Sequence, residues 1–184
     1  MREQLGERLP TFTQEEFQLL AEGPVDFYGM NYYTCQYAKH ISTPVPDTDW
    51  KGNVEELQEN KAGTPMGEQA GIFWLQSVPA GFRKHLLRIY RKYGKVIYIT
   101  ENGCPCPGED KMTKEESVND EFRQRYFSDH LDAITGAIQD GSIVKGYLAW
   151  SLMDNLGKSR SLKPPKLASF SASFLETDAL CADN

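Results

Sequence analysis

The chain is poor in features that define several classes of protein. Only 4 of its 184 residues are cysteine, which is too few for a disulfide-stabilised scaffold of this length. The sequence contains no Asn-x-Ser/Thr sequon, and its first residues lack the apolar segment of a secretory signal. These absences predict a reducing, cytoplasmic location.

Long apolar runs and an excess of basic charge are also missing. No apolar stretch approaches the roughly 18 residues of a membrane-spanning helix, so no membrane association is expected. The 26 acidic residues outnumber the 20 basic ones and give a net charge of −6, which argues against a nucleic-acid partner. The remaining composition, 40% hydrophobic and 25% charged, is that of one globular domain.

Nucleotide and metal sites are not indicated either. No glycine-rich turn joins a strand to a helix, so a nucleotide- or phosphate-binding fold is not expected. Cys104 and Cys106 are close together, but no second Cys/His pair accompanies them. We therefore expect neither a metal nor a cofactor.

Three apolar segments predict the strands of a parallel sheet, at residues 27–34, 96–100 and 144–152. They are apolar on both faces, which is typical of buried parallel strands. Residues 35–78 and 102–113 form unusually long connections after the first two strands. They leave the carboxyl ends of those strands, where parallel α/β proteins place their sites.

Helical patterns separate these strands. A capping box at Thr13 and Glu16 opens the first helix, with Phe17, Leu20 and Ala21 predicted to face inward. A second helix is predicted from Pro79 to Gly94 and a third from about Ser117 to Asp140. Helices alternating with strands predict an α/β fold with right-handed crossovers. Residues 83–92 are locally basic, which favours a solvated helix face over a binding patch.

One carboxylate stands out as a candidate for chemistry. Glu101 follows the second predicted strand directly, and Asn31 and Tyr33, two residues apart at the end of the first strand, point the same way. Trp150 offers a flat apolar ring at the same level. A carboxylate, an amide and aromatic walls are typical of a sugar site, although a surface glutamate and core aromatics would also fit this pattern.

These residues lie in three of four strings that resemble the C-terminal part of the glycoside hydrolase family 1 β-glucosidases, fungal intracellular members above all. The strings are Asp26-Phe-Tyr-Gly-Met-Asn-Tyr-Tyr-Thr34, Val78-Pro-Ala-Gly-Phe-Arg-Lys84, Ile97-Tyr-Ile-Thr-Glu-Asn-Gly103 and Gly146-Tyr-Leu-Ala-Trp-Ser-Leu-Met-Asp-Asn155. The resemblance implies an α/β fold, a (β/α)8 TIM barrel of which this chain holds approximately strands six to eight. It implies that Glu101 is the catalytic nucleophile, that Asn31 and Tyr33 contact it and the substrate, and that Trp150 stacks on the sugar.

The chain also departs from the family. The Thr-Asn-Glu-Pro string that carries the family's acid/base glutamate has no counterpart, and Asp154 is a weak substitute. After Asn155 the family's Phe-Glu-Trp is replaced by Leu-Gly-Lys. We therefore expect a family segment over residues 1–155 and a disordered, unrelated tail over residues 156–184.

The resemblance implies retaining hydrolysis of terminal β-D-glucosides, with a β-glucoside or a cello-oligosaccharide as substrate. Because the acid/base half is missing, the chain alone is expected to be inactive. The alternative is a non-catalytic fragment that docks on a complementary barrel half or weakly binds carbohydrate.

Overall fold

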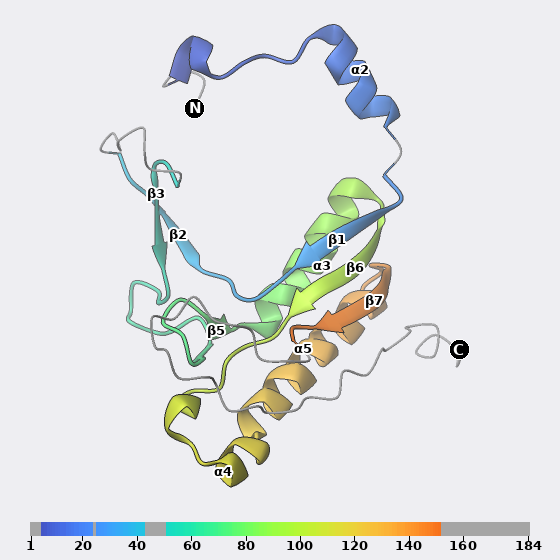
Figure 1. Ribbon diagram of the computed structural model, residues 1–184. Coiled ribbons are helices and arrows are strands. Elements are labelled where there is room, and N and C mark those ends of the chain that lie inside the picture. The colour runs from blue at the N-terminus through green and yellow to red at the C-terminus, as the bar shows by residue number, and fades with distance from the viewer. Residues whose placement is uncertain (1–4, 24, 43–50, 152–184) are drawn as a thin grey trace.

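A computed structural model describes residues 5–23, 25–42 and 51–151 (Figure 1). The predicted tail and Asp154 lie outside the described residues. The helices are η1 (Gly6–Arg8), α2 (Gln14–Glu22), α3 (Pro79–Tyr93), η2 (Glu109–Lys111), α4 (Lys114–Val118) and α5 (Glu121–Gln139). The strands are β1 (Phe27–Asn31), β2 (Tyr37–His40), β3 (Val54–Leu57), β4 (Glu68–Gln69), β5 (Gln76–Ser77), β6 (Val96–Asn102) and β7 (Val144–Ala149).

The central sheet has three parallel strands in the order β1-β6-β7. Helix α3 makes the crossover from β1 to β6, and α5 makes the crossover from β6 to β7. The predicted α/β fold is therefore confirmed. The strand ends differ from the prediction, since β1 ends at Asn31 and β6 continues to Asn102.

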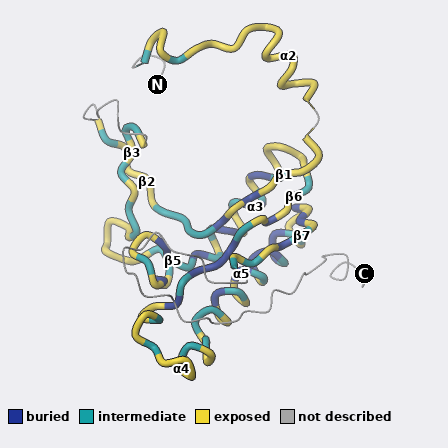
Figure 2. The backbone as a smooth tube through the Cα atoms, in the orientation of Figure 1, coloured by how far each residue is buried: buried dark blue, intermediate teal, exposed yellow. Residues whose placement is uncertain are grey.

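Helices α3 and α5 cover one face of this sheet (Figure 1). Figure 2 shows that burial concentrates along the strands and the inner sides of these two helices. The core between them consists of Met30, Tyr32, Phe82, Leu86, Ile89, Ile97, Ile99, Ala133, Ile134, Ala137, Val144 and Tyr147. Gly94, in the left-handed region with φ 61°, ends α3 as predicted.

The other side of the sheet, which we call the open face, lies opposite helices α3 and α5 and carries partly exposed apolar side chains. Its large side chains are between 37% and 50% exposed; they are Phe27, Tyr98, Leu148 and Trp150. Tyr98 is in register with Gly29 and Gly146, so residues two positions away along each strand share its face. The sequence predicted strands buried on both faces, and this is correct for one face only.

Helix α2 forms where predicted, but its environment differs from the prediction. Its capping box is present, with the Glu16 amide donating to Thr13 Oγ1 at 3.2 Å and the Thr13 amide donating to the Glu16 carboxylate at 2.8 Å. Phe17 and Leu20, predicted to face inward, are 55% and 62% exposed, and Ala21 is exposed as well. The helix lies away from the sheet in Figure 1, so its apolar side has no described surface to bury.

The long connection between β1 and α3 contains secondary structure that the sequence pattern did not reveal. Strands β2 and β3 form one antiparallel pair, and β4 and β5 form another. The predicted third helix is also divided into α4 and α5. Asp120 separates them because its side chain accepts a hydrogen bond from the Arg123 amide and so caps α5. Among the described residues, no helix is long and apolar enough to cross a bilayer.

Candidate active site

Glu101 lies near the carboxyl end of the central strand and is partly exposed. Strict alternation would place it on the same side as Ile97 and Ile99, which are fully buried against the helices. Strand β6 instead carries one extra residue at this point. Met30 and Asn31 of β1 are adjacent, yet their partners in β6 are Ile99 and Glu101.

The pairing with β7 shows the same irregularity, which falls between Ile99 and Asn102. Beyond it, Asn102 is fully buried whereas Thr100 is exposed and Glu101 partly so. The extra residue therefore turns Glu101 away from the helices, and a bulge of this kind re-aims a side chain at the end of a strand.

Tyr33 makes the decisive contact with this carboxylate. Its phenol donates a short hydrogen bond to Glu101 Oε2. Burial and this bond both raise the pKa of Tyr33, so the phenol stays protonated and remains a donor at neutral pH. Within the described residues, Oε1 of Glu101 accepts no hydrogen bond, so one carboxylate oxygen is held and the other is available.

Asn31 is the register partner of Glu101 on the neighbouring strand. Its side chain is exposed, and its Oδ1 accepts a hydrogen bond from Thr100 Oγ1 at 2.6 Å. With the amide oxygen fixed in this way, the Nδ2 group is free to donate to a bound molecule. The structure thus places Asn31 beside the Glu101 backbone, but its side chain is hydrogen-bonded to Thr100 and not to the Glu101 carboxylate.

Trp150 follows β7 directly and is 45% exposed. Its amide donates to the Asn102 carbonyl at 2.8 Å, which holds its backbone beside the end of β6. The exposed indole lies at the carboxyl end of the sheet, beside the segment that carries Glu101. All four predicted site residues therefore come from the same end of three adjacent strands.

Two features of this region escaped the sequence pattern. Trp74, from the long connection after β1, presents its ring edge-on to Tyr33 with centroids 6.4 Å apart, and it is 40% exposed. Asn102 is fully buried and hydrogen-bonds to groups from several elements. An aromatic residue inside a long loop carries no periodicity that would have revealed Trp74.

The loop after β6 is held by a partly buried arginine. Arg123 Nε donates to the Cys104 carbonyl at 3.0 Å, and the guanidinium also pairs with Asp120 and Glu109. Glu109 is therefore engaged, as is Glu68, which pairs with Arg125 at 3.1 Å. Both carboxylates are therefore paired with arginines within the described residues.

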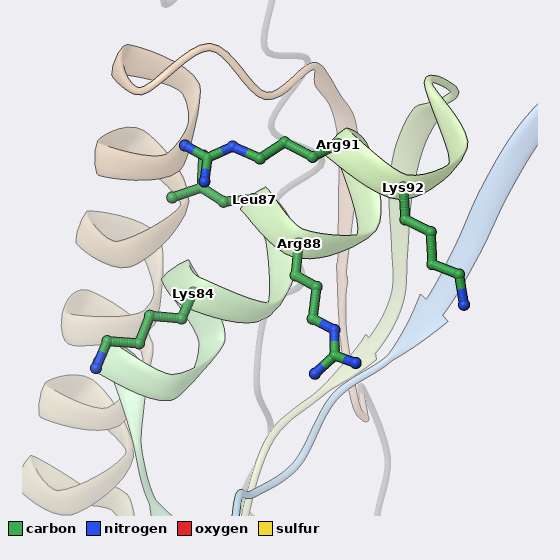
Figure 3. Close-up of a pocket in the computed structure, with 5 residues that line it drawn as sticks. All are labelled: Lys84, Leu87, Arg88, Arg91 and Lys92. Carbon is green, nitrogen blue, oxygen red and sulfur yellow. The ribbon is translucent and has the colours of Figure 1, made fainter.

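A hollow elsewhere on the surface lies along α3 (Figure 3). It is lined by Lys84, Leu87, Arg88, Arg91 and Lys92, all from that helix. Figure 3 shows the basic side chains spreading in different directions from the helix. This arrangement supports the predicted solvated face. Among the described residues, no group of three or more His, Cys, Asp or Glu side chains is placed to hold a metal.

Comparison with known proteins gives one consistent result. The sequence matches glycosyl hydrolase family 1 over residues 1–164. It is 40% identical to beta-glucosidase 1B of Phanerodontia chrysosporium over 156 residues, covering 84% of this chain and 28% of that protein.

Solved structures agree with the sequence match. The structure of beta-glucosidase 2 from Trichoderma reesei in complex with Tris is similar with a TM-score of 0.77 and 48% identity, over 84% of this chain and 34% of that one. A mutant of rice Os3BGlu6 beta-glucosidase in a covalent complex with Glc matches with a TM-score of 0.75 and 31% identity, over 96% of this chain and 36% of that one.

The chain thus spans about three-tenths of the length of the curated relatives. These neighbours are TIM-barrel enzymes, so the three parallel strands and their helices form part of an α/β barrel, as predicted. The fungal resemblance is likewise confirmed. The chain belongs to glycosyl hydrolase family 1.

Proposed function

We propose that this chain carries the nucleophile side of a retaining β-glucosidase site, with Glu101 as the nucleophile. The observation that carries the proposal is the hydrogen bond from Tyr33 to Glu101 Oε2, at the carboxyl end of a barrel strand, with Oε1 left available. The covalent complex of the rice relative with Glc supports a covalent route. Trp150 would stack on the sugar ring, and the Asn31 amide would donate to a sugar hydroxyl.

The proposed reaction has two steps. Oε1 of Glu101 attacks the anomeric carbon of a β-glucoside, and the bond to the aglycone oxygen breaks while a general acid gives that oxygen a proton. Water then attacks the anomeric carbon of the glucosyl-Glu101 ester and loses a proton to the same acid/base group. This second step releases glucose and restores the carboxylate. Tyr33 holds Oε2 throughout and orients the nucleophile.

We propose that the acid/base group comes from outside the described residues. Retaining enzymes need two carboxyl groups about 5 to 5.5 Å apart. Glu68 and Glu109 are held by arginines, and Asp26 precedes β1 at the opposite end of the sheet. General acid–base catalysis contributes roughly 10² to 10⁴ in rate, so this chain alone is expected to show no turnover of an aryl β-glucoside above buffer.

The test uses a completed chain, in which this sequence follows the amino-terminal portion of the Trichoderma reesei relative. The completed chain should hydrolyse an aryl β-glucoside, and Glu101→Gly should abolish that activity. Azide should then restore aglycone release and give the α-glucosyl azide, because it enters from the face that the carboxylate vacates. Glu109→Gly is the matched control and should retain hydrolysis.

Two results would contradict the proposal. Full hydrolysis by Glu101→Gly would show that another group attacks the sugar. A β-glucosyl azide product from the same variant would assign Glu101 to the acid/base role instead of the nucleophile.

The open face supports a second candidate function. A row of large apolar side chains, between 37% and 50% exposed, is unusual on a solvated sheet surface. In the barrel relatives the sheet closes on itself, so we propose that the open face docks on a complementary barrel half. In this role the chain would act as a non-catalytic or complementing fragment.

Co-expression with the amino-terminal portion of the Trichoderma reesei relative tests this docking. The two pieces should co-elute in size-exclusion chromatography, and Leu148→Ser on the open face should abolish co-elution. Phe73→Ser is the control, because Phe73 is 84% exposed and lies in the long connection outside the sheet. Equal loss of co-elution in both variants, or co-elution unaffected by Leu148→Ser, would contradict docking through this face.

A further inference from the structure

Asn102 directly follows the proposed nucleophile but faces the opposite side of the sheet. It is 0% exposed, whereas Glu101 is partly exposed on the open side. Strict alternation from Ile97 and Ile99 would exchange these two orientations. Specific interactions must therefore hold the Asn102 side chain on the helix side. The same interactions keep Glu101 on the open face, because the two residues are adjacent.

The Asn102 amide makes three hydrogen bonds with groups from three other parts of the fold. Nδ2 donates to the Tyr32 carbonyl at 2.8 Å and to the Tyr126 hydroxyl at 2.9 Å. Oδ1 accepts from the Tyr147 hydroxyl at 2.7 Å. The chain after β1, helix α5 and strand β7 are therefore all joined to β6 through one side chain.

The direction of each hydrogen bond in this network can be assigned from its donors and acceptors. A backbone carbonyl can only accept, so the Asn102 group facing Tyr32 must be Nδ2, and the orientation of the amide is fixed. Both Nδ2 protons are then used. The Tyr126 hydroxyl accepts one of them and gives its own proton to the Tyr33 carbonyl at 3.4 Å. Tyr147 supplies the proton for Oδ1, so no donor in the network lacks an acceptor.

The surrounding rings keep the network rigid and uncharged. Tyr126 is 2% exposed and stacks on His130 with ring centroids 4.0 Å apart. Tyr147 is 7% exposed. Burial raises the pKa of both tyrosines, so both remain protonated donors at neutral pH.

This network also fixes the backbone on both sides of the Tyr33 α-carbon. Asn102 holds the Tyr32 carbonyl, Tyr126 holds the Tyr33 carbonyl, and the Tyr32 amide donates to the Glu101 carbonyl at 2.9 Å. The Tyr33 phenol thus reaches Glu101 from a backbone whose two neighbouring carbonyls are both hydrogen-bonded. Both Tyr33 and Glu101 therefore depend on Asn102. Glu101 precedes Asn102 directly in the chain, and the Tyr33 backbone is held by the hydrogen-bond network of Asn102.

We infer that Asn102 is the positioning residue of this site, which keeps Glu101 on the open face and within reach of the Tyr33 phenol. Its role as an aid to catalysis rests on the proposed function; its role in holding the Tyr33–Glu101 pair does not. Asn102 itself touches no substrate, because its side chain is wholly enclosed on the helix side.

The first experiment measures the Tyr33–Glu101 pair in the full chain without any reaction. Tyrosines are labelled with ¹³C at Cζ, the Tyr33 resonance is assigned with Tyr33→Phe, and its ionisation is followed by NMR as pH rises. Asn102→Ala should make Tyr33 ionise at lower pH, because the phenol loses its carboxylate partner. Ser142→Ala is the matched control. It removes a buried bond of 2.8 Å to the Ala137 carbonyl, before the amino end of β7, and should leave Tyr33 unchanged.

Tyr147→Phe covers the case in which Asn102→Ala does not fold. It removes only the proton given to Oδ1 and should shift Tyr33 ionisation in the same direction by a smaller amount. If Tyr33 titrates as in the parent chain in every folded variant, the inference is wrong. If Ser142→Ala moves Tyr33 as far as Asn102→Ala, the effect is general destabilisation and the inference is equally wrong.

The second experiment separates this inference from the proposed function. In the completed chain, Asn102→Ala should slow labelling by an activated 2-fluoro-glucoside on the order of 10²-fold, as expected for a misplaced nucleophile. Ser142→Ala should label at the parent rate. A shifted Tyr33 with no labelling of the parent chain would retain the positioning role and reject the proposed function. Normal labelling of Asn102→Ala would reject the positioning role alone.

Discussion

Replacing Gly103 by alanine should separate the carboxyl ends of β6 and β7. A Cβ at this position would lie 1.9 Å from the Trp150 carbonyl oxygen and 3.0 Å from the carbonyl carbon. Both are backbone atoms, so no side-chain rotation relieves the overlap. The strand end must move, and the hydrogen bond of 2.8 Å from the Trp150 amide to the Asn102 carbonyl lies directly beside the clash.

The expected cost follows from two contributions. Forcing extra volume into a packed site typically costs about 1–3 kcal/mol, and losing one backbone hydrogen bond adds about 1 kcal/mol. Gly103→Ala should therefore lower the free energy of unfolding by about 2–4 kcal/mol. Equilibrium urea denaturation of the full chain, followed by tryptophan fluorescence, measures this difference.

Gly29→Ala provides the matched control in the neighbouring strand. Its Cβ would meet the nearest atoms at 3.7 and 3.8 Å, which are ordinary contacts. Alanine is also favoured over glycine within a strand by roughly 0.5–1 kcal/mol, so this variant should be neutral or slightly stabilised. If Gly103→Ala unfolds at the same urea concentration as Gly29→Ala, the close approach of the two strand ends is not real.

Three further predictions concern single side chains. In the completed chain, Tyr33→Phe should slow labelling of Glu101 about 10- to 100-fold, because a hydrogen bond to an ionised group contributes about 1.5–3 kcal/mol; an unchanged labelling rate would contradict the role of the phenol. Burial raises the pKa of the Cys104 thiol to about 12. The unfolded chain therefore loses this proton at lower pH than the folded chain, and stability falls as pH rises from about 8.5. In Cys104→Ala the urea midpoint should depend less on pH between about pH 8 and 10. Burial lowers the pKa of His130, so the unfolded chain binds a proton that the folded chain excludes. The free energy of unfolding should therefore decrease as pH falls below about 6.5. If His130→Gln shows the same dependence of unfolding free energy on pH, this prediction is wrong.

The main elements of the fold could be predicted because their signals are local. The Thr13 capping box, Pro79 in the first turn of α3 and the glycine that ends α3 are all present where the sequence indicates. The exposure of α2 could not be predicted from its own pattern, which indicated an inward face at Phe17, Leu20 and Ala21. Its apolar side is complete in the sequence, but no described surface covers it.

The topology that gathers the candidate site could be predicted from the sequence, but the local geometry of its residues could not. Strand ends bring Asn31, Glu101 and Trp150 to one edge of a parallel sheet, and this follows from topology. The extra residue in β6 does not follow, because strict alternation would bury Glu101. The φ of Gly103 is not positive, so backbone conformation does not explain a glycine here. It is needed because the Trp150 carbonyl comes so close.

Mass spectrometry after an activated 2-fluoro-glucoside tests the assignment of the nucleophile most directly. The completed chain is incubated with the reagent, digested with trypsin and sequenced by fragmentation. We predict one adduct, on the peptide of residues 96–111, with fragment ions that place the sugar on Glu101 and not on Glu109 or Asp110 of the same peptide. An adduct on any other carboxylate, or an active completed chain that forms no adduct, would contradict the assignment.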